Sequence, residues 1–225
     1  MQAVRVLENT VVGNRLHHIV LDTQSTDLPA SYTVPGQYVQ LTIGEERPAY
    51  MAIASAPGSA NFEFLIQSTD GTAGSICATE AGGEVLVSAP MGNGFNMDAI
   101  KSNTPLFFVT GTGISAIRSV IESGDWNNTG ARLYYGSYTP EDMAYQDKFE
   151  EWKQRGVQVH ALISESTATA WEGQIGFVQD AYAEDPVEDA SKAVLVLCGA
   201  KIMCEKATEL LTAAGMPAEH ALTNY

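Results

Sequence analysis

Residues Leu106–Ser119 read LFFVTGTGISAIRS, and this stretch decides the fold of the second half of the chain. The apolar run at its start predicts a buried strand, and Gly111-Thr112-Gly113 then lets the backbone turn sharply and approach a ligand closely. The helix expected after the turn directs free N–H groups toward it, which suits a phosphate. A glycine turn alone is also an ordinary connection between a strand and a helix, so its meaning depends on the rest of the sequence.

The character of the chain changes near residue 100. Before it, short strands rich in Val, Ile, Tyr and Phe alternate with turn residues, which is typical of a small antiparallel β-barrel. After it, strands alternate with helices, which predicts a parallel sheet covered by helices. The predicted fold therefore has two domains: a β-barrel over residues 1–100 and an α/β domain over residues 101–225. We expect barrel strands at 3–9, 16–22, 38–43, 51–55, 62–67 and 84–89 with one helix at 73–80, then a polar linker at 101–105, strands at 106–109, 131–135, 158–163 and 193–197, and helices at 115–123, 140–154 and 201–214.

Composition excludes several classes of function. A formal net charge of −15 excludes nucleic acid as a partner, because phosphates would be repelled. The three cysteines are scattered, which argues against a disulfide framework or an iron–sulfur cluster and for a reducing compartment. No apolar run approaches the length of a membrane span. The four histidines do not have the spacing of metal ligands, so we propose no metal. We expect a cytoplasmic protein, or a plastid stromal one whose transit peptide has been removed.

Two further segments give the glycine turn its meaning. Arg47–Ser55 reads RPAYMAIAS upstream of the turn, and Val196–Gly199 reads VLCG downstream of it. In this order and spacing, the three segments resemble the ferredoxin–NADP reductase superfamily of flavin and nicotinamide oxidoreductases, and the resemblance covers nearly the whole chain. It implies that the barrel binds FAD and that the α/β domain binds NADH or NADPH. The MAIAS form is similar to plastid-type proteins described as ferredoxin–NADP reductase-like.

The resemblance assigns flavin contacts in two registers. Arg47 would meet the FAD pyrophosphate in both. Counting forward from Arg47 makes Tyr50 the aromatic that stacks on the flavin, whereas counting back from Ser55 places Met51 at the aromatic position and Ala52 where the family carries a hydroxyl. We favour the second register, with a bulge that lets Arg47 still reach the pyrophosphate. A solvated loop arginine and a core tyrosine are the plainer alternative.

A second flavin signature precedes the barrel helix. The sequence Gly71–Ser75, GTAGS, places Gly74 and the Ser75 hydroxyl at a helix start, where a pyrophosphate is readily bound. Ser75 as a plain N-cap explains the same segment. Ile66, on the strand expected at 62–67, is a further candidate flavin contact.

The nicotinamide side of the resemblance uses the glycine turn and the downstream segment. Gly111, Thr112 and Gly113 would hold the coenzyme pyrophosphate. Cys198, followed by Gly199, would lie beside the nicotinamide ring, at the carboxyl end of a strand where open α/β sheets bind ligands. A small buried core cysteine is the alternative. The terminal Tyr225 would stack on the flavin, unless the terminus is frayed.

Coenzyme choice and electron acceptor are less narrowly specified. Members that prefer NADPH often place an arginine after Tyr-Gly-x, and Tyr138 stands there instead, which weakens a preference for NADPH. Residues 1–100 carry only Arg5, Arg15 and Arg47 as basic side chains, so docking of an acidic ferredoxin is disfavoured.

The resulting hypothesis is an oxidoreductase that moves a hydride between NAD(P)H and flavin and passes electrons to an unidentified acceptor. The alternatives are an FAD-binding or regulatory module with little turnover, and an electron-transfer subunit of a larger complex.

Overall fold

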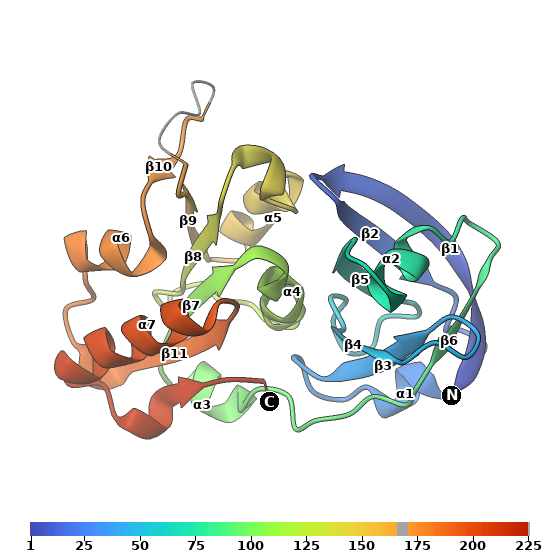
Figure 1. Ribbon diagram of the computed structural model, residues 1–225. Helices are drawn as coiled ribbons and strands as arrows, with labels where there is room; N and C mark the ends of the chain where they lie inside the picture. The colour runs from blue at the N-terminus through green and yellow to red at the C-terminus, as the bar shows by residue number, and fades with distance from the viewer. Residues whose placement is uncertain (166–170, 225) are drawn as a thin grey trace.

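The structure is a computed structural model that describes residues 1–165 and 171–224. Two sheets lie side by side, with helix α4 (Ile114–Glu122) packed between them (Figure 1). The first sheet occupies residues 2–87 and the second residues 104–222. The predicted fold class, an antiparallel barrel followed by a parallel α/β sheet, is confirmed.

The first sheet is antiparallel and curls into a barrel. Its strands are β1 (Gln2–Gly13), β2 (Leu16–Leu21), β3 (Tyr38–Thr42), β4 (Ala49–Ala52), β5 (Phe62–Gln67) and β6 (Glu84–Val87), in the order β4-β3-β6-β1-β2-β5. The long β1 pairs with β6 through its first residues and with β2 through the rest. Alternate residues of β5 (Phe62, Phe64 and Ile66) are buried in the barrel core, as the two-residue period of a strand requires. Helices α1 (Leu28–Ser31) and α2 (Thr72–Cys77) complete this half.

The second sheet is parallel throughout. Its strands are β7 (Thr104–Thr110), β8 (Arg132–Ser137), β9 (Gln158–Ile163), β10 (Gln174–Ile175), β11 (Ala193–Cys198) and β12 (Ala221–Leu222), in the order β10-β9-β8-β7-β11-β12. Helices α3 (Met97–Ser102), α4 and α5 (Phe149–Gln154) pack on one face, and α6 (Val178–Glu184) and α7 (Lys201–Ala213) on the other. Short 3-10 turns lie at Gly111–Gly113, Pro140–Asp142, Gln146–Lys148, Ala190–Lys192 and Ala218–His220.

Burial on both faces explains the apolar run of β7. Phe107 and Val109 pack with α4, whereas Leu106 and Phe108 pack with α6 and α7. The cluster around α4 also contains Leu16 and Leu65 from the barrel, so one helix is packed against both sheets. The start of α4, where the glycine turn ends, is therefore held directly against the barrel.

The structure corrects three predictions of secondary structure. The strand expected at 51–55 lies instead at Ala49–Ala52, as β4. The helix expected at 140–154 is interrupted, because Tyr145 adopts a left-handed conformation with φ of 61° and only Phe149–Gln154 is α-helical. The expected linker at 101–105 is instead the end of α3 and the start of β7. Asn96 caps α3 by accepting a hydrogen bond from the Ala99 N–H, and Ile100 is buried, so this segment is tied to the core.

Candidate functional site

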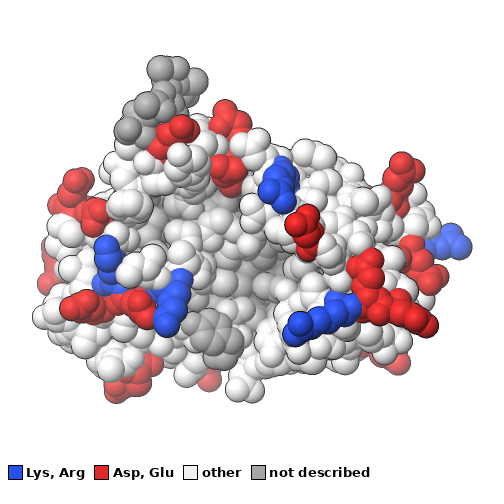
Figure 2. Space-filling view, in the orientation of Figure 1, with Lys and Arg blue, Asp and Glu red and all other residues white. Residues whose placement is uncertain are grey.

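A cleft of about 1000 Å³ lies between the barrel and the parallel sheet. The hollow at the centre of the face shown in Figure 2 has an uncharged floor, and charged side chains stand on its rim. Strands β2, β4 and β5 form its barrel side. The carboxyl ends of β7, β8 and β11 and the starts of α4, α6 and α7 form its other side. The cleft is as large as small-molecule sites in proteins become, and it draws on both halves of the chain. The predicted site residues that line it are Tyr50, Met51, Ala52, Gly111, Thr112, Gly113, Cys198 and Gly199.

The glycine turn is packed against the end of β11. Strands β7 and β11 are neighbours with Val109 opposite Cys198, so both chains leave the sheet at the same point. A Cβ at Gly113 would lie 2.7 Å from the Cys198 carbonyl carbon and 3.0 Å from the Gly199 nitrogen. Gly199 has φ of 140°, and a Cβ there would lie 2.8 Å from the Thr110 nitrogen. Both glycines are thus required by close backbone approach, and Thr110 Oγ1 closes the corner by accepting a hydrogen bond from the Ala200 N–H at 2.8 Å.

Cys198 presents a neutral thiol to the cleft. Burial, with a smaller contribution from the charge of a Cys204 thiolate, raises its pKa to about 12, so the thiol stays protonated at neutral pH. Its Sγ donates to Asn224 Oδ1 at 3.9 Å, and Asn224 Nδ2 donates to the Gly36 carbonyl of the barrel at 3.1 Å. Asn224, which sequence reasoning missed, therefore joins the end of β11 to the barrel. Tyr225, expected to stack on flavin, lies outside the described residues.

Strand β4 presents its residues on alternate sides. Tyr50 and Ala52 share one side, and the Tyr50 ring is 65% exposed and packs edge-on against Tyr38, with ring centroids 5.8 Å apart. Met51 packs against the barrel core. The expected bulge is absent from β4, because its ladder with β3 runs without a register shift from Ala49 to Ala52. The exposed aromatic ring of β4 is accordingly that of Tyr50.

The predicted pyrophosphate residues lie beside the cleft rather than in its wall. Arg47 is exposed in the loop before β4, and its carbonyl accepts a hydrogen bond from Thr72 Oγ1 at 2.7 Å. That contact brings the start of α2 next to Arg47. Ser75 is not the N-cap, which is Gly71, and its hydroxyl donates to Glu46 Oε1 at 2.8 Å. A phosphate at this place would have to displace Glu46 to reach Ser75.

Two predicted residues of this region serve packing. A Cβ on Gly74 would contact the Thr69 carbonyl, so this glycine is needed for the close approach of α2 to that loop. Ile66 is 1% exposed inside the barrel, and its side chain is not a wall of the cleft. The period of two sends its neighbours Leu65 and Gln67 to the other face of β5, where both line the cleft.

Ser115 is a cleft residue that sequence reasoning missed. It lies in the first turn of α4, is 2% exposed, and its buried hydroxyl has no hydrogen-bond partner within residues 1–165 and 171–224. An unpaired buried hydroxyl is unfavourable by about 1–3 kcal/mol, so a ligand that hydrogen-bonds it gains that energy back. The signal was available in the sequence, since Ser115 follows the glycine turn by two residues, at the start of the expected helix. An unpaired donor beside free helix N–H groups fits a nucleotide phosphate.

Over residues 1–165 and 171–224, no group of three or more His, Cys, Asp or Glu side chains could hold a metal ion. None of the helices there is long and apolar enough to cross a membrane.

Comparison with known proteins supports one family. Residues 107–209 match the family described as the oxidoreductase NAD-binding domain. The chain is 38% identical to the fruit protein pKIWI502 of Actinidia deliciosa, over 92% of this chain and 71% of that protein. It is 30% identical to ferredoxin–NADP reductase B of Sorangium cellulosum, over 82% of both chains.

A solved structure shows the same fold. The ferredoxin–NADP+ reductase of Neisseria gonorrhoeae, solved with bound FAD and NADP, superposes with a TM-score of 0.79 and 16% identity, over 95% of this chain and 91% of that one.

Proposed function

This chain belongs to the ferredoxin–NADP reductase superfamily, and on that premise we propose which of its residues carry the reaction. It is an NAD(P)H-dependent flavin oxidoreductase that passes electrons on to an acceptor. FAD and NAD(P)H, when bound, supply the chemistry, in which a hydride passes from nicotinamide C4 to flavin N5. The protein orients the two cofactors for hydride transfer and excludes water from the space between them.

One observation carries the assignment of roles. Tyr50 and Ala52 of the barrel, and Gly113 and Cys198 of the parallel sheet, line the same cleft. We infer that Tyr50 packs against the flavin and that the N–H groups of residues 111–113, with the Ser115 hydroxyl, bind the coenzyme pyrophosphate. Cys198 contributes a small neutral group beside the nicotinamide. Because its thiol stays protonated, it acts in positioning and not as a nucleophile.

Arg47 is proposed to neutralise the FAD pyrophosphate. Its guanidinium is exposed and makes no ion pair with any described residue, and its loop adjoins the start of α2. Ala52 leaves this part of β4 without a side-chain hydroxyl. A hydrogen bond to flavin N5 would then have to come from a backbone N–H.

NADH is the coenzyme that the cleft favours. Tyr138 lines the cleft at the place where the resembled NADPH-preferring proteins carry an arginine, and its ring is 64% exposed. Lys206 is the one cationic side chain among the described residues that line the cleft. Asp142 also lines it, and its carboxylate already accepts hydrogen bonds from the Thr139 N–H and hydroxyl. Among the described residues that line the cleft, no arginine guanidinium is therefore present to bind a 2′-phosphate through paired N–H donors.

An acceptor without strong negative charge is favoured by the charge of the chain. A net charge of −15 repels an acidic ferredoxin, and the barrel has few basic side chains to offset this. Reduction rates of candidate acceptors, measured as a function of ionic strength, test the point. The rate with an acidic ferredoxin should rise with salt as repulsion is screened; a fall with salt would contradict the proposal.

The visible spectrum of the purified protein tests the function. Flavin absorption, present on purification or after FAD is added, should bleach when NADH is added without oxygen. Bleaching by NADPH alone would overturn the coenzyme assignment. Bound FAD that neither coenzyme reduces would favour the alternative of a reductase-fold binding or regulatory module. Failure to bind FAD at all would refute the function.

A further inference from the structure

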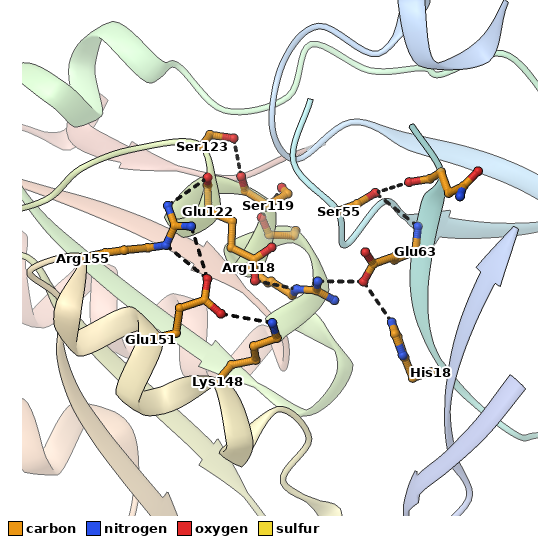
Figure 3. Close-up of polar contacts among 12 residues, drawn as sticks. His18, Ser55, Glu63, Arg118, Ser119, Glu122, Ser123, Lys148, Glu151 and Arg155 are labelled. Atoms are coloured by element: carbon orange, nitrogen blue, oxygen red, sulfur yellow. Dashed lines mark hydrogen bonds and ion pairs between the residues drawn. The ribbon is translucent and has the colours of Figure 1, made fainter. Parts of the chain in front are cut away.

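A charged cluster around a buried arginine joins the barrel to the helix α4 of the parallel-sheet half. Arg118 of α4 places Nη2 2.7 Å from Glu63 Oε2 of β5, and the same carboxylate oxygen is 3.0 Å from His18 Nε2 of β2 (Figure 3). Arg118 Nε also pairs with Glu122 Oε1 at 2.8 Å, and its guanidinium lies 4.8 Å from the centre of the Tyr145 ring. The Arg118 side chain is 6% exposed. We call Arg118, Glu63 and His18 the bridging cluster.

Glu63 and Arg118 of the bridging cluster are charged at neutral pH. Burial acts to raise the pKa of Glu63, but hydrogen bonds from His18 and Arg118 and the charge of the guanidinium outweigh it and lower the pKa to about 2. Burial likewise disfavours the charge of Arg118, yet Glu122, Tyr145 and Glu63 keep its pKa above the ordinary value. The carboxylate and the guanidinium are thus both ionised. If they separated, the buried guanidinium would keep Glu122 as its only carboxylate partner among the described residues.

The three elements that carry the bridging cluster, β5, β2 and α4, also contribute residues that line the cleft. On β5, Glu63 is followed at the strand period by Leu65 and Gln67, which line the cleft. On β2, Leu16 and His18 stand two residues apart, and Leu16 lines the cleft.

On α4, Ser115 lines the cleft one helical turn before Arg118. The ion pair therefore links the barrel wall of the cleft to the helix that begins at the glycine turn.

The surroundings hold both partners in place. The Glu63 N–H donates to Ser55 Oγ at 3.2 Å, so the strand that carries the carboxylate is itself fixed. Next to Arg118, Ser119 Oγ accepts a hydrogen bond from the Gly36 N–H of the barrel at 3.1 Å. Helix α4 thus meets the barrel through two polar contacts on consecutive residues.

From this geometry, and resting on the proposed function, we propose that the bridging cluster positions the two cofactor sites for hydride transfer. Arg118, Glu63 and His18 touch neither cofactor site themselves. They act through β5 and α4, and they set the separation and angle of the two walls. A change of about 1 Å in such a geometry can slow a reaction by roughly 100-fold. Loosening the cluster should therefore slow flavin reduction at saturating coenzyme while FAD stays bound.

The experiment compares Glu63→Gln with Glu151→Gln in the full-length protein. Glu151 is a matched control, because it also pairs with two cations, Lys148 at 3.1 Å and Arg155 at 3.2 Å, but all three belong to the parallel-sheet half (Figure 3). Both variants are measured for FAD content, for the limiting rate of flavin bleaching by NADH in an anaerobic stopped-flow instrument, and for amide hydrogen exchange in β5 and α4.

Glu63→Gln should keep its FAD and lower the limiting rate by about tenfold or more, with faster exchange in both β5 and α4, whereas Glu151→Gln should match the wild type. A wild-type limiting rate in Glu63→Gln, or faster exchange confined to β5, overturns the proposal. His18→Gln is the milder second variant, should Glu63→Gln not fold. If neither coenzyme bleaches the wild-type flavin, the proposed function fails, and the exchange comparison still decides whether the cluster joins the two halves.

Discussion

Replacing Gly113 by alanine tests whether the glycine turn and the end of β11 must touch. The added Cβ would lie 2.7 Å from the Cys198 carbonyl carbon and 3.0 Å from the Gly199 nitrogen, whereas ordinary contact begins at 3.4 Å. Both neighbours are backbone atoms and cannot rotate away. The turn and β11 must therefore separate by something approaching 1 Å, and overpacking of this kind costs about 1–3 kcal/mol.

Two measurements read the consequence. The midpoint of thermal unfolding should fall by roughly 2–12 °C, since a domain of this size loses about 2–4 °C per kcal/mol. The limiting rate of flavin reduction should fall by about 100-fold, because the nicotinamide site moves relative to the barrel.

Gly156→Ala is the matched control. Gly156 has φ of 91°, and a Cβ there would lie 2.5 Å from the Trp126 carbonyl carbon, but it does not line the cleft. This variant should lose comparable stability and keep its rate of flavin reduction. A Gly113→Ala protein that is destabilised yet reduces its flavin as fast as wild type would refute the reasoning, because the contact would then serve folding alone.

Three further predictions concern single side chains. The pKa of Glu63 is lowered from 4.5 to about 2, so its ion pairs stabilise the fold above pH 4.5 and are lost as the pH falls toward 2. Urea unfolding measured between these pH values should show the free energy of unfolding fall by up to about 3 kcal/mol. Glu63→Gln should lack this acid-dependent fall. Ser115→Ala should leave the apoprotein as stable or up to about 1 kcal/mol more stable, because it removes an unpaired buried hydroxyl, while it weakens NADH binding measured by titration; unchanged binding would exclude Ser115 from the coenzyme site. Tyr138→Arg should raise the affinity for NADPH relative to NADH by about tenfold or more, and an unchanged ratio would place the 2′-phosphate elsewhere.

The strands and the glycine turn could be predicted because local sequence specifies them. The strand at 62–67 places a glutamate between two phenylalanines and ends on a glutamine, and the strand at 158–163 is followed by a polar segment. Both strands have the predicted bounds. The elements that escaped prediction are short or depend on tertiary contacts. Strands β10 and β12 are two residues each and carry no period. The break lies at Tyr145, whose ring packs against Arg118, a residue far away in the sequence.

The site could be predicted only where a single residue type carries the chemistry. Gly113 and Cys198 follow from a glycine turn and a strand end, and the structure brings them together. Ile66 was assigned without regard to which face of β5 it occupies. Asn224 and the bridging cluster were beyond sequence reasoning, because each joins segments that meet only in the folded chain. The division of the chain at residue 100 and the roles of the site residues remain predictions.

The most direct test of the account is a single-turnover reduction of the bound flavin by NADH deuterated at C4. If the cleft is where a hydride crosses from nicotinamide to flavin, deuterium in the transferred position should slow the bleaching about two-fold or more, and Gly113→Ala should slow it further. Bleaching that neither deuterium nor the Gly113 substitution affects would mean that hydride transfer in this cleft does not govern reduction, and the account would be contradicted.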